Sequence, residues 1–260
     1  MSRAARSRRS KMGTSRASGV PTVLPAYEPS RYHQGELLPS GCEPERREIS
    51  PGVVLISGWL TPEEQHALVD QFREWALPPA GLRHPRVPRG HLMSVQSVCL
   101  GWHWQPYAYS RTADDTDGAA VKPLPPRIAQ LGRRAVTDTF GSSAGREFEP
   151  DAVIANLYAA EARLGLHQDA EEASPAPVVT ISVGDTCLFR IAGVDRRTSP
   201  FIDIHLHSGD LLVFGGPSRR IYHGVPKVYE NTGPHIPGMP AGRLSLTIRE
   251  TGLTAEPQRP

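Results

Sequence analysis

Residues 151–169 read DAVIANLYAAEARLGLHQD, and this stretch decides which class of fold the chain can adopt. It contains two short extended segments, Ala152–Tyr158 and residues 164–168, separated by a polar turn. Their composition and length are typical of β-strands, in which side chains at positions i and i+2 share one face. His167 and Asp169 are two positions apart, so both side chains can point to the same side of the chain.

The strand pattern continues toward the end of the chain. Turn signals such as Ser208-Gly209-Asp210 separate six further short apolar segments: 178–183, 187–191, Ile202–Leu206, Leu211–Phe214, 221–225 and 244–249. Eight short strands at this spacing favour a sandwich or jelly roll over a fold of alternating strands and helices.

The preceding region predicts one buried strand at residues 53–56 and two helices. Thr61 can cap the first helix, Pro62 suits its first position, and Glu64 completes a capping box. Three apolar residues then share one helical face: Leu68, Phe72 and Trp75. A second helix is predicted to begin near Pro125-Pro126, with Ile128, Leu131 and Ala135 turned inward.

The composition indicates an ordinary soluble domain. Of the 260 residues, 38% are hydrophobic and 22% are charged, which allows a sizeable core in one large domain, with or without an appendage. No apolar run approaches the roughly 18 residues that a membrane span needs. Cys42, Cys99 and Cys187 are too widely spaced for a disulfide framework or a zinc site, so a reducing, cytoplasmic setting is expected.

Residues 1–45 are rich in Arg, Ser, Pro and Gly without periodicity, so little fixed structure is expected there. Residues 1–20 hold six of the 29 basic residues and no acidic ones, which leaves 23 basic against 27 acidic residues in the remainder. The net charge of the remainder does not by itself indicate nucleic-acid binding. If the protein binds nucleic acid, we expect binding through a local basic patch, helped by this basic tail. A transit peptide is the alternative interpretation of the tail.

His167 and Asp169 are the first side chains that could bind a metal ion. One imidazole and one carboxylate on a single face make two-thirds of the facial triad that non-haem Fe(II) oxygenases use. A third ligand must come from elsewhere in the chain, and His223 lies on a later predicted strand, 54 residues after Asp169. His205-x-His207 could bind a metal by the same geometry and stays open as an alternative.

Arg243 and Arg249 are the second pair, six positions apart on one predicted strand. The even spacing places both guanidinium groups on the same face. Arginine forms bidentate pairs with carboxylates, and a dicarboxylate offers two ends to hold. Two inward arginines are costly to bury without such a partner.

Four motifs in this order resemble the AlkB family of oxidative nucleic-acid dealkylases: Asn156-Leu-Tyr158, His167-Gln-Asp169, Tyr222-His223-Gly224 and Arg243-x₅-Arg249. The resemblance runs from about Met93 to Leu253. It implies a mainly β double-stranded β-helix, or jelly roll, with two flanking helices and a nucleotide-recognition lid. A single domain is then expected at residues 46–255, with helices and lid in 46–150 and the catalytic core in 151–253.

The resemblance also implies the cofactors, Fe(II), 2-oxoglutarate and O₂. His167, Asp169 and His223 would hold the iron. Arg243 would bind the C1-carboxylate end of 2-oxoglutarate, and Arg249 the C5-carboxylate or its neighbourhood. Three more residues would face the co-substrate: Asn156, Tyr158 and Ser245, the last standing where some members have asparagine.

Substrate contacts are implied for five residues of lid and loops: Met93, Trp102, Tyr109, Glu171 and Arg196. Trp102 would stack on a flipped base opposite His223, Tyr109 would contact a phosphate, and Glu171 would sense an exocyclic amine. Plain structural alternatives exist: a core tryptophan, a solvated turn at Glu171-Glu172, and an exposed loop pair at Arg196-Arg197.

The implied activity is demethylation of bases such as N1-methyladenine or N3-methylcytosine in DNA or RNA, with release of formaldehyde, succinate and CO₂. The nucleic acid would be single-stranded or present a flipped base, and the enzyme would act as a monomer in DNA alkylation repair. A tRNA-modifying or protein-directed hydroxylase, a non-catalytic metal-binding sensor and a zinc hydrolase are alternatives. The last leaves Arg243 and Arg249 unexplained.

Overall fold

The computed structural model describes residues 44–87, 90–198 and 200–254. The prediction of little fixed structure at 1–45 falls almost wholly outside these residues. Glu45 already belongs to a strand, one residue before the predicted start of the domain.

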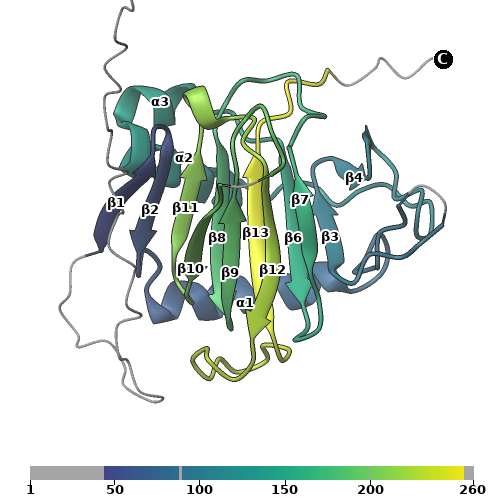
Figure 1. The fold of residues 1–260 in the computed structure, drawn as a ribbon. Coiled ribbons are helices and arrows are strands. Elements are labelled where there is room, and N and C mark those ends of the chain that lie inside the picture. The colour runs from purple at the N-terminus through teal and green to yellow at the C-terminus, as the bar shows by residue number, and fades with distance from the viewer. Residues whose placement is uncertain (1–43, 88–89, 199, 255–260) are drawn as a thin grey trace, which may run out of the picture. The chain divides into compact units, whose positions relative to one another are not determined.

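The described residues form two antiparallel sheets that lie face to face, as in a jelly roll (Figure 1). The larger sheet has the order β1 (Glu45–Ser50), β2 (Val53–Ser57), β11 (Leu211–Phe214), β8 (Val178–Gly184), β13 (Arg243–Arg249), β6 (Ala152–Tyr158) and β3 (Gln96–Leu100). The smaller sheet has the order β10 (Ile202–Leu206), β9 (Thr186–Ile191), β12 (His223–Tyr229) and β7 (Leu164–His167). A separate hairpin consists of β4 (His103–Gln105) and β5 (Ala108–Ser110).

Helices cover the outer face of the larger sheet. α1 (Pro62–Ala76) and α2 (Pro126–Phe140) pack on it through one apolar cluster. The other helices among the described residues are α3 (Ser142–Glu147) and the short η1 (Gly216–Ser218). Both predicted helix starts are confirmed, and α3 was not predicted. No helix in the described part of the chain is long and apolar enough to cross a membrane.

The central strand β13 has two chemically different faces, as its alternating sequence requires. Its apolar residues pack toward α1 and α2: Leu244, Leu246 and Ile248. Its polar residues line a cavity between the two sheets: Arg243, Ser245, Thr247 and Arg249. Both sets are buried, so the strand carries a core on one face and a polar site on the other.

Three predicted strands, now β6, β10 and β11, have the predicted bounds. The other predicted strands differ by one residue at one end, except that β12 begins at His223 and runs on to Tyr229. The strands β1, β3, β4 and β5 were not predicted. β1 is a polar, largely exposed edge strand, so it lacks the apolar pattern that signals a strand.

The capping box of α1 gives a first testable prediction. The Glu64 backbone N–H donates to Thr61 Oγ1 over 3.3 Å, and the Thr61 N–H donates to Glu64 Oε2 over 3.0 Å. Thr61→Ala should lower the free energy of unfolding by about 1 kcal/mol, because one N–H of the first turn loses its partner. Urea denaturation measures this, and Thr61→Ser, which keeps the hydroxyl, should stay close to the parent.

Candidate active site

Two histidines of the smaller sheet lie next to each other and line the cavity between the sheets. His167 ends β7, His223 begins β12, and the two residues are paired across these antiparallel strands. Their ring centroids are 4.4 Å apart. Gly224 permits this approach, since a Cβ there would lie 2.7 Å from the Leu164 carbonyl oxygen. The glycine of the Tyr222-His223-Gly224 motif is therefore a packing requirement of the site.

Asp169 joins the two histidines from just beyond the end of β7. The strand was predicted to reach Gln168, but it ends at His167, and the Gln168 side chain donates to the carbonyl oxygens of Val194 and Arg220. One ligand atom from each of His167, Asp169 and His223 lies within 4.8 Å of the others. The predicted triad is thus brought together by the fold.

The triad fits a divalent metal ion. Asp169 Oδ2 is buried, has no hydrogen-bond partner within the described part of the chain, and lies 3.8 Å from His223 Nε2. A buried carboxylate oxygen with no donor is costly unless a cation completes its surroundings. Two imidazoles and one carboxylate are the donor set of non-haem Fe(II) sites.

The electrostatics of Asp169 and His223 favour the forms that bind a metal, whereas Asp169 raises the pKa of His167 against the effect of burial. Burial alone would raise the pKa of Asp169, but Arg249 and the two imidazoles hold that pKa well below its usual range. Burial, reinforced by His167, lowers the pKa of His223 to about 4. Near neutral pH the site therefore presents an ionised carboxylate and a neutral His223, as metal ligation requires.

A cavity between the sheets adjoins the triad. The larger sheet contributes mainly polar side chains to its lining: Asn156, Tyr158, Thr180, Arg243, Ser245, Thr247 and Arg249. The smaller sheet contributes the two histidines and apolar side chains, among them Leu164, Phe189 and Val225. Every predicted co-substrate residue lines this cavity.

The two arginines of β13 have different surroundings. Arg249 is neutralised, because its Nη2 lies 2.8 Å from Asp169 Oδ1 and its Nη1 lies 2.7 Å from Glu172 Oε1. Arg243 is fully buried, and it donates to the hydroxyls of Ser182 and Ser245. Its Nη1 has no hydrogen-bond partner among the residues that the structure describes. Arg243 is therefore a buried cation whose surroundings suit an incoming carboxylate.

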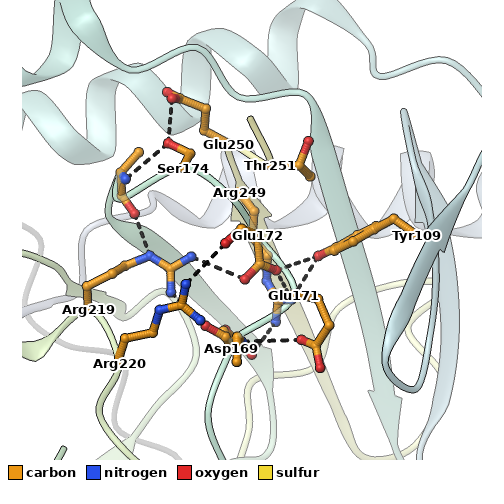
Figure 2. A network of polar contacts seen from close by, with 12 residues as sticks. Tyr109, Asp169, Glu171, Glu172, Ser174, Arg219, Arg220, Arg249, Glu250 and Thr251 are labelled. Atoms are coloured by element: carbon orange, nitrogen blue, oxygen red, sulfur yellow. Dashed lines mark hydrogen bonds and ion pairs between the residues drawn. The ribbon is translucent and has the colours of Figure 1, made fainter. Parts of the chain in front are cut away.

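Glu172 is a buried residue beside the triad that the sequence prediction did not single out. The solvated turn expected at Glu171-Glu172 is wrong for this residue, whose side chain is fully buried between Arg249 and Arg219 (Figure 2). Burial would raise the pKa of Glu172, but Arg249 and Arg219 hold it below its ordinary value. No sequence pattern marks Glu172, because Arg219 and Arg249 reach it only through tertiary contacts.

Trp102 does not provide an open stacking face in this structure. Its indole is buried, the ring N–H donates to Asp151 Oδ2 over 3.0 Å, and the Arg111 guanidinium covers the ring at 3.5 Å. Trp102 is thus buried, as the core alternative describes, and it is not among the residues that line the cavity.

Tyr109 also differs from its predicted role. Its hydroxyl points inward, donates to Glu172 Oε1 over 2.6 Å and accepts from Arg249 Nη1 over 3.0 Å, as Figure 2 shows. Burial raises the pKa of Tyr109 well above its ordinary value, so the hydroxyl remains a donor. A hydroxyl engaged in this way is not available to a phosphate.

The remaining predicted contacts lie at or near the surface. Glu171 is half-buried, Arg196 is exposed in the loop between β9 and β10, and Met93 packs partly buried against the inter-sheet core. Among the described residues, His205 and His207 do not belong to a group of three metal-ligating side chains. His207 Nδ1 lies 3.1 Å from the Thr186 hydroxyl, and His205 Nε2 lies 3.3 Å from that of Tyr229.

A jelly roll with a His-Asp-His triad beside a cavity lined by two arginines defines the class of Fe(II)- and 2-oxoglutarate-dependent oxygenases. Residues 52–249 match the model of the 2OG-Fe(II) oxygenase superfamily. The chain belongs, within this class, to the AlkB family of dioxygenases.

Three comparisons support this assignment. The chain is 35% identical to the alpha-ketoglutarate-dependent dioxygenase AlkB homolog of Caulobacter vibrioides, over 77% of this chain and 88% of that protein. It is 33% identical to the DNA N(6)-methyladenine demethylase ALKBH1D of Arabidopsis thaliana, over 79% of this chain. The solved structure of OsALKBH1 matches with a TM-score of 0.71 and 29% identity, covering 79% of this chain and all of that one. The chain spans about half the length of the Arabidopsis relative.

Proposed function

We propose that this protein removes N-linked methyl groups from nucleic-acid bases by oxidation, with release of formaldehyde, succinate and CO₂. The triad beside a cavity lined by Arg243, a buried cation without a carboxylate partner among the described residues, carries the proposal. The relatives named as AlkB dioxygenases and as DNA N(6)-methyladenine demethylases support a methylated base as substrate.

His167, Asp169 and His223 would hold Fe(II), and Fe(II) with 2-oxoglutarate and O₂ supplies the oxidising chemistry. The 2-oxo acid end of 2-oxoglutarate would be the end beside the metal-binding triad. Because Arg249 contacts the ligand Asp169, we assign Arg249 to that C1 end and Arg243 to the C5-carboxylate. This reverses the assignment expected from the sequence.

Other side chains of the cavity would orient the co-substrate and exclude water. Asn156, Tyr158 and Ser245 lie beside Arg243 on β6 and β13, where they can hydrogen-bond the same carboxylate. Phe189 stacks on the His223 ring with centroids 5.6 Å apart, and Phe214 packs against that ring at 4.8 Å. This aromatic packing keeps water away from one side of the metal site.

For the nucleic acid we propose an aromatic contact from Tyr107 in place of Trp102. Tyr107 is 75% exposed at the tip of the β4–β5 hairpin, with a φ of 73° that is unusual for a bulky side chain. Glu171, Arg196 and Met93 stay in the proposal as further contacts to a single-stranded or flipped substrate.

Tyr107→Ala is expected to weaken binding of a single-stranded oligonucleotide by roughly 5- to 150-fold, because a stacked base contributes about 1–3 kcal/mol. Fluorescence polarisation with a labelled oligonucleotide measures the change. Leu77→Ala removes another exposed apolar side chain, after the end of α1, and should leave affinity unaltered. Equal affinities for the parent and Tyr107→Ala would rule out the contact.

The test of the function measures formaldehyde and succinate from oligonucleotides that carry N1-methyladenine, N3-methylcytosine or N6-methyladenine. Fe(II) and 2-oxoglutarate are present, and a reaction without 2-oxoglutarate is the control. Formaldehyde that requires both the methylated base and 2-oxoglutarate supports the proposal. Succinate without formaldehyde would contradict the dealkylase assignment and point to a hydroxylase with another substrate, such as tRNA or protein.

All proposed ligands come from one chain, so we expect the monomer to be active. Cys99 and Cys187 are free and buried, which is consistent with the reducing, cytoplasmic setting expected from the sequence.

A further inference from the structure

A buried carboxylate outside the triad links two arginines that both hold Asp169. Arg249 contacts the Asp169 side chain, and Arg219 Nη1 donates to the Asp169 carbonyl oxygen over 2.9 Å. Glu172 joins them, with Oε1 2.7 Å from Arg249 Nη1 and Oε2 3.2 Å from Arg219 Nη2. The contacts form a closed ring that fixes Asp169 by its side chain and its backbone (Figure 2).

The net charge of this ring of side chains affects how strongly a cation can bind at the neighbouring triad. The two arginines and the two carboxylates cancel, and the side chains of Arg219, Glu172 and Arg249 are each less than a tenth exposed. Without the charge of Glu172, the ring would carry a net positive charge directly beside the triad. Screening is weak at such burial, so this charge would repel an incoming divalent ion.

We propose that Glu172 is a positioning residue for the metal centre, which acts through Arg249 and Arg219 to orient Asp169 and to cancel one guanidinium charge. The inference rests on the proposed metal site. It assigns Glu172 no contact with substrate and no part in proton transfer. In other proteins, mutation of a residue that holds a metal ligand in this way typically lowers metal affinity by about 10- to 100-fold.

Tyr109 extends the same arrangement to the β4–β5 hairpin. Its hydroxyl donates to Glu172 Oε1, the oxygen that also faces Arg249. The hairpin that carries the exposed Tyr107 is therefore tied to the ring around Asp169. Loss of the Tyr109 hydroxyl should loosen Glu172 without changing any charge.

The test is titration of the metal-free protein with Co(II), followed by calorimetry and by the visible spectrum of the bound ion. Glu172→Gln keeps the shape and removes the charge, and it should lower Co(II) affinity by about 10- to 100-fold and alter the spectrum. Glu161→Gln removes an exposed carboxylate and should leave both unchanged. Thermal melting of the metal-free proteins shows whether each variant is folded.

The outcomes separate this inference from the function on which it rests. Failure of the parent protein to bind Co(II), or binding that survives His223→Ala, would remove the metal site itself. Tight binding by the parent and by folded Glu172→Gln, with identical spectra, would overturn the role of Glu172 alone. Should Glu172→Gln not fold, Tyr109→Phe decides: affinity lowered several-fold supports the inference, and parental affinity contradicts it.

Discussion

Replacing His167 with alanine is expected to lower metal affinity by more than about 100-fold and to abolish formaldehyde release. Outer partners of a metal ligand already contribute 10- to 100-fold, so loss of a ligand should cost more. His167 and His223 are paired across β7 and β12, so nothing else in the described strands can take the vacated position. Calorimetric metal titration and the formaldehyde assay measure the two effects.

His205→Ala is the matched control for this experiment. His205 lies on β10 outside the triad, in the pair that the sequence left open as an alternative metal site. Parental metal affinity and activity are expected for His205→Ala. If His205→Ala lost metal affinity and activity while His167→Ala kept both, the assignment of the triad would be wrong.

Replacing Arg243 with methionine is expected to raise the KM for 2-oxoglutarate by roughly 30-fold to several thousand-fold. Truncating one partner of a buried, hydrogen-bonded charge pair costs about 2–5 kcal/mol. Arg243 is fully buried, and Tyr158 lies beside its guanidinium, with 5.2 Å between the ring centroid and the guanidinium carbon. Succinate formation at increasing 2-oxoglutarate concentration provides the measurement.

The same variant should leave the affinity for the metal alone unchanged, because Arg243 does not touch the triad. Arg190→Met is a suitable control, since Arg190 pairs with Asp203 on the surface of the smaller sheet. An unaltered KM in folded Arg243→Met protein would contradict the assignment of Arg243 to the co-substrate.

Most of the fold and of the inner site was predictable because both depend on periodic local patterns. The capping box at Thr61 and Glu64 fixed the start of α1, and alternation along β13 placed its two arginines on one face. The edge strand β1 escaped prediction because edge strands are selected for polar residues that hide the strand pattern. The inward direction of Trp102 and Tyr109 was not predicted either. An aromatic side chain near a turn can point into the fold or toward solvent, and the local sequence does not distinguish the two.

Sequence alone determined the ligand types, their order and their faces, since side-chain direction along a strand follows from a period of two residues. Tertiary structure decided which partners each side chain meets. It turned Trp102 and Tyr109 inward, left Tyr107 exposed and buried Glu172 between two arginines. These contacts join residues up to 140 positions apart, so they depend on how the sheets and loops pack and leave no local pattern in the chain.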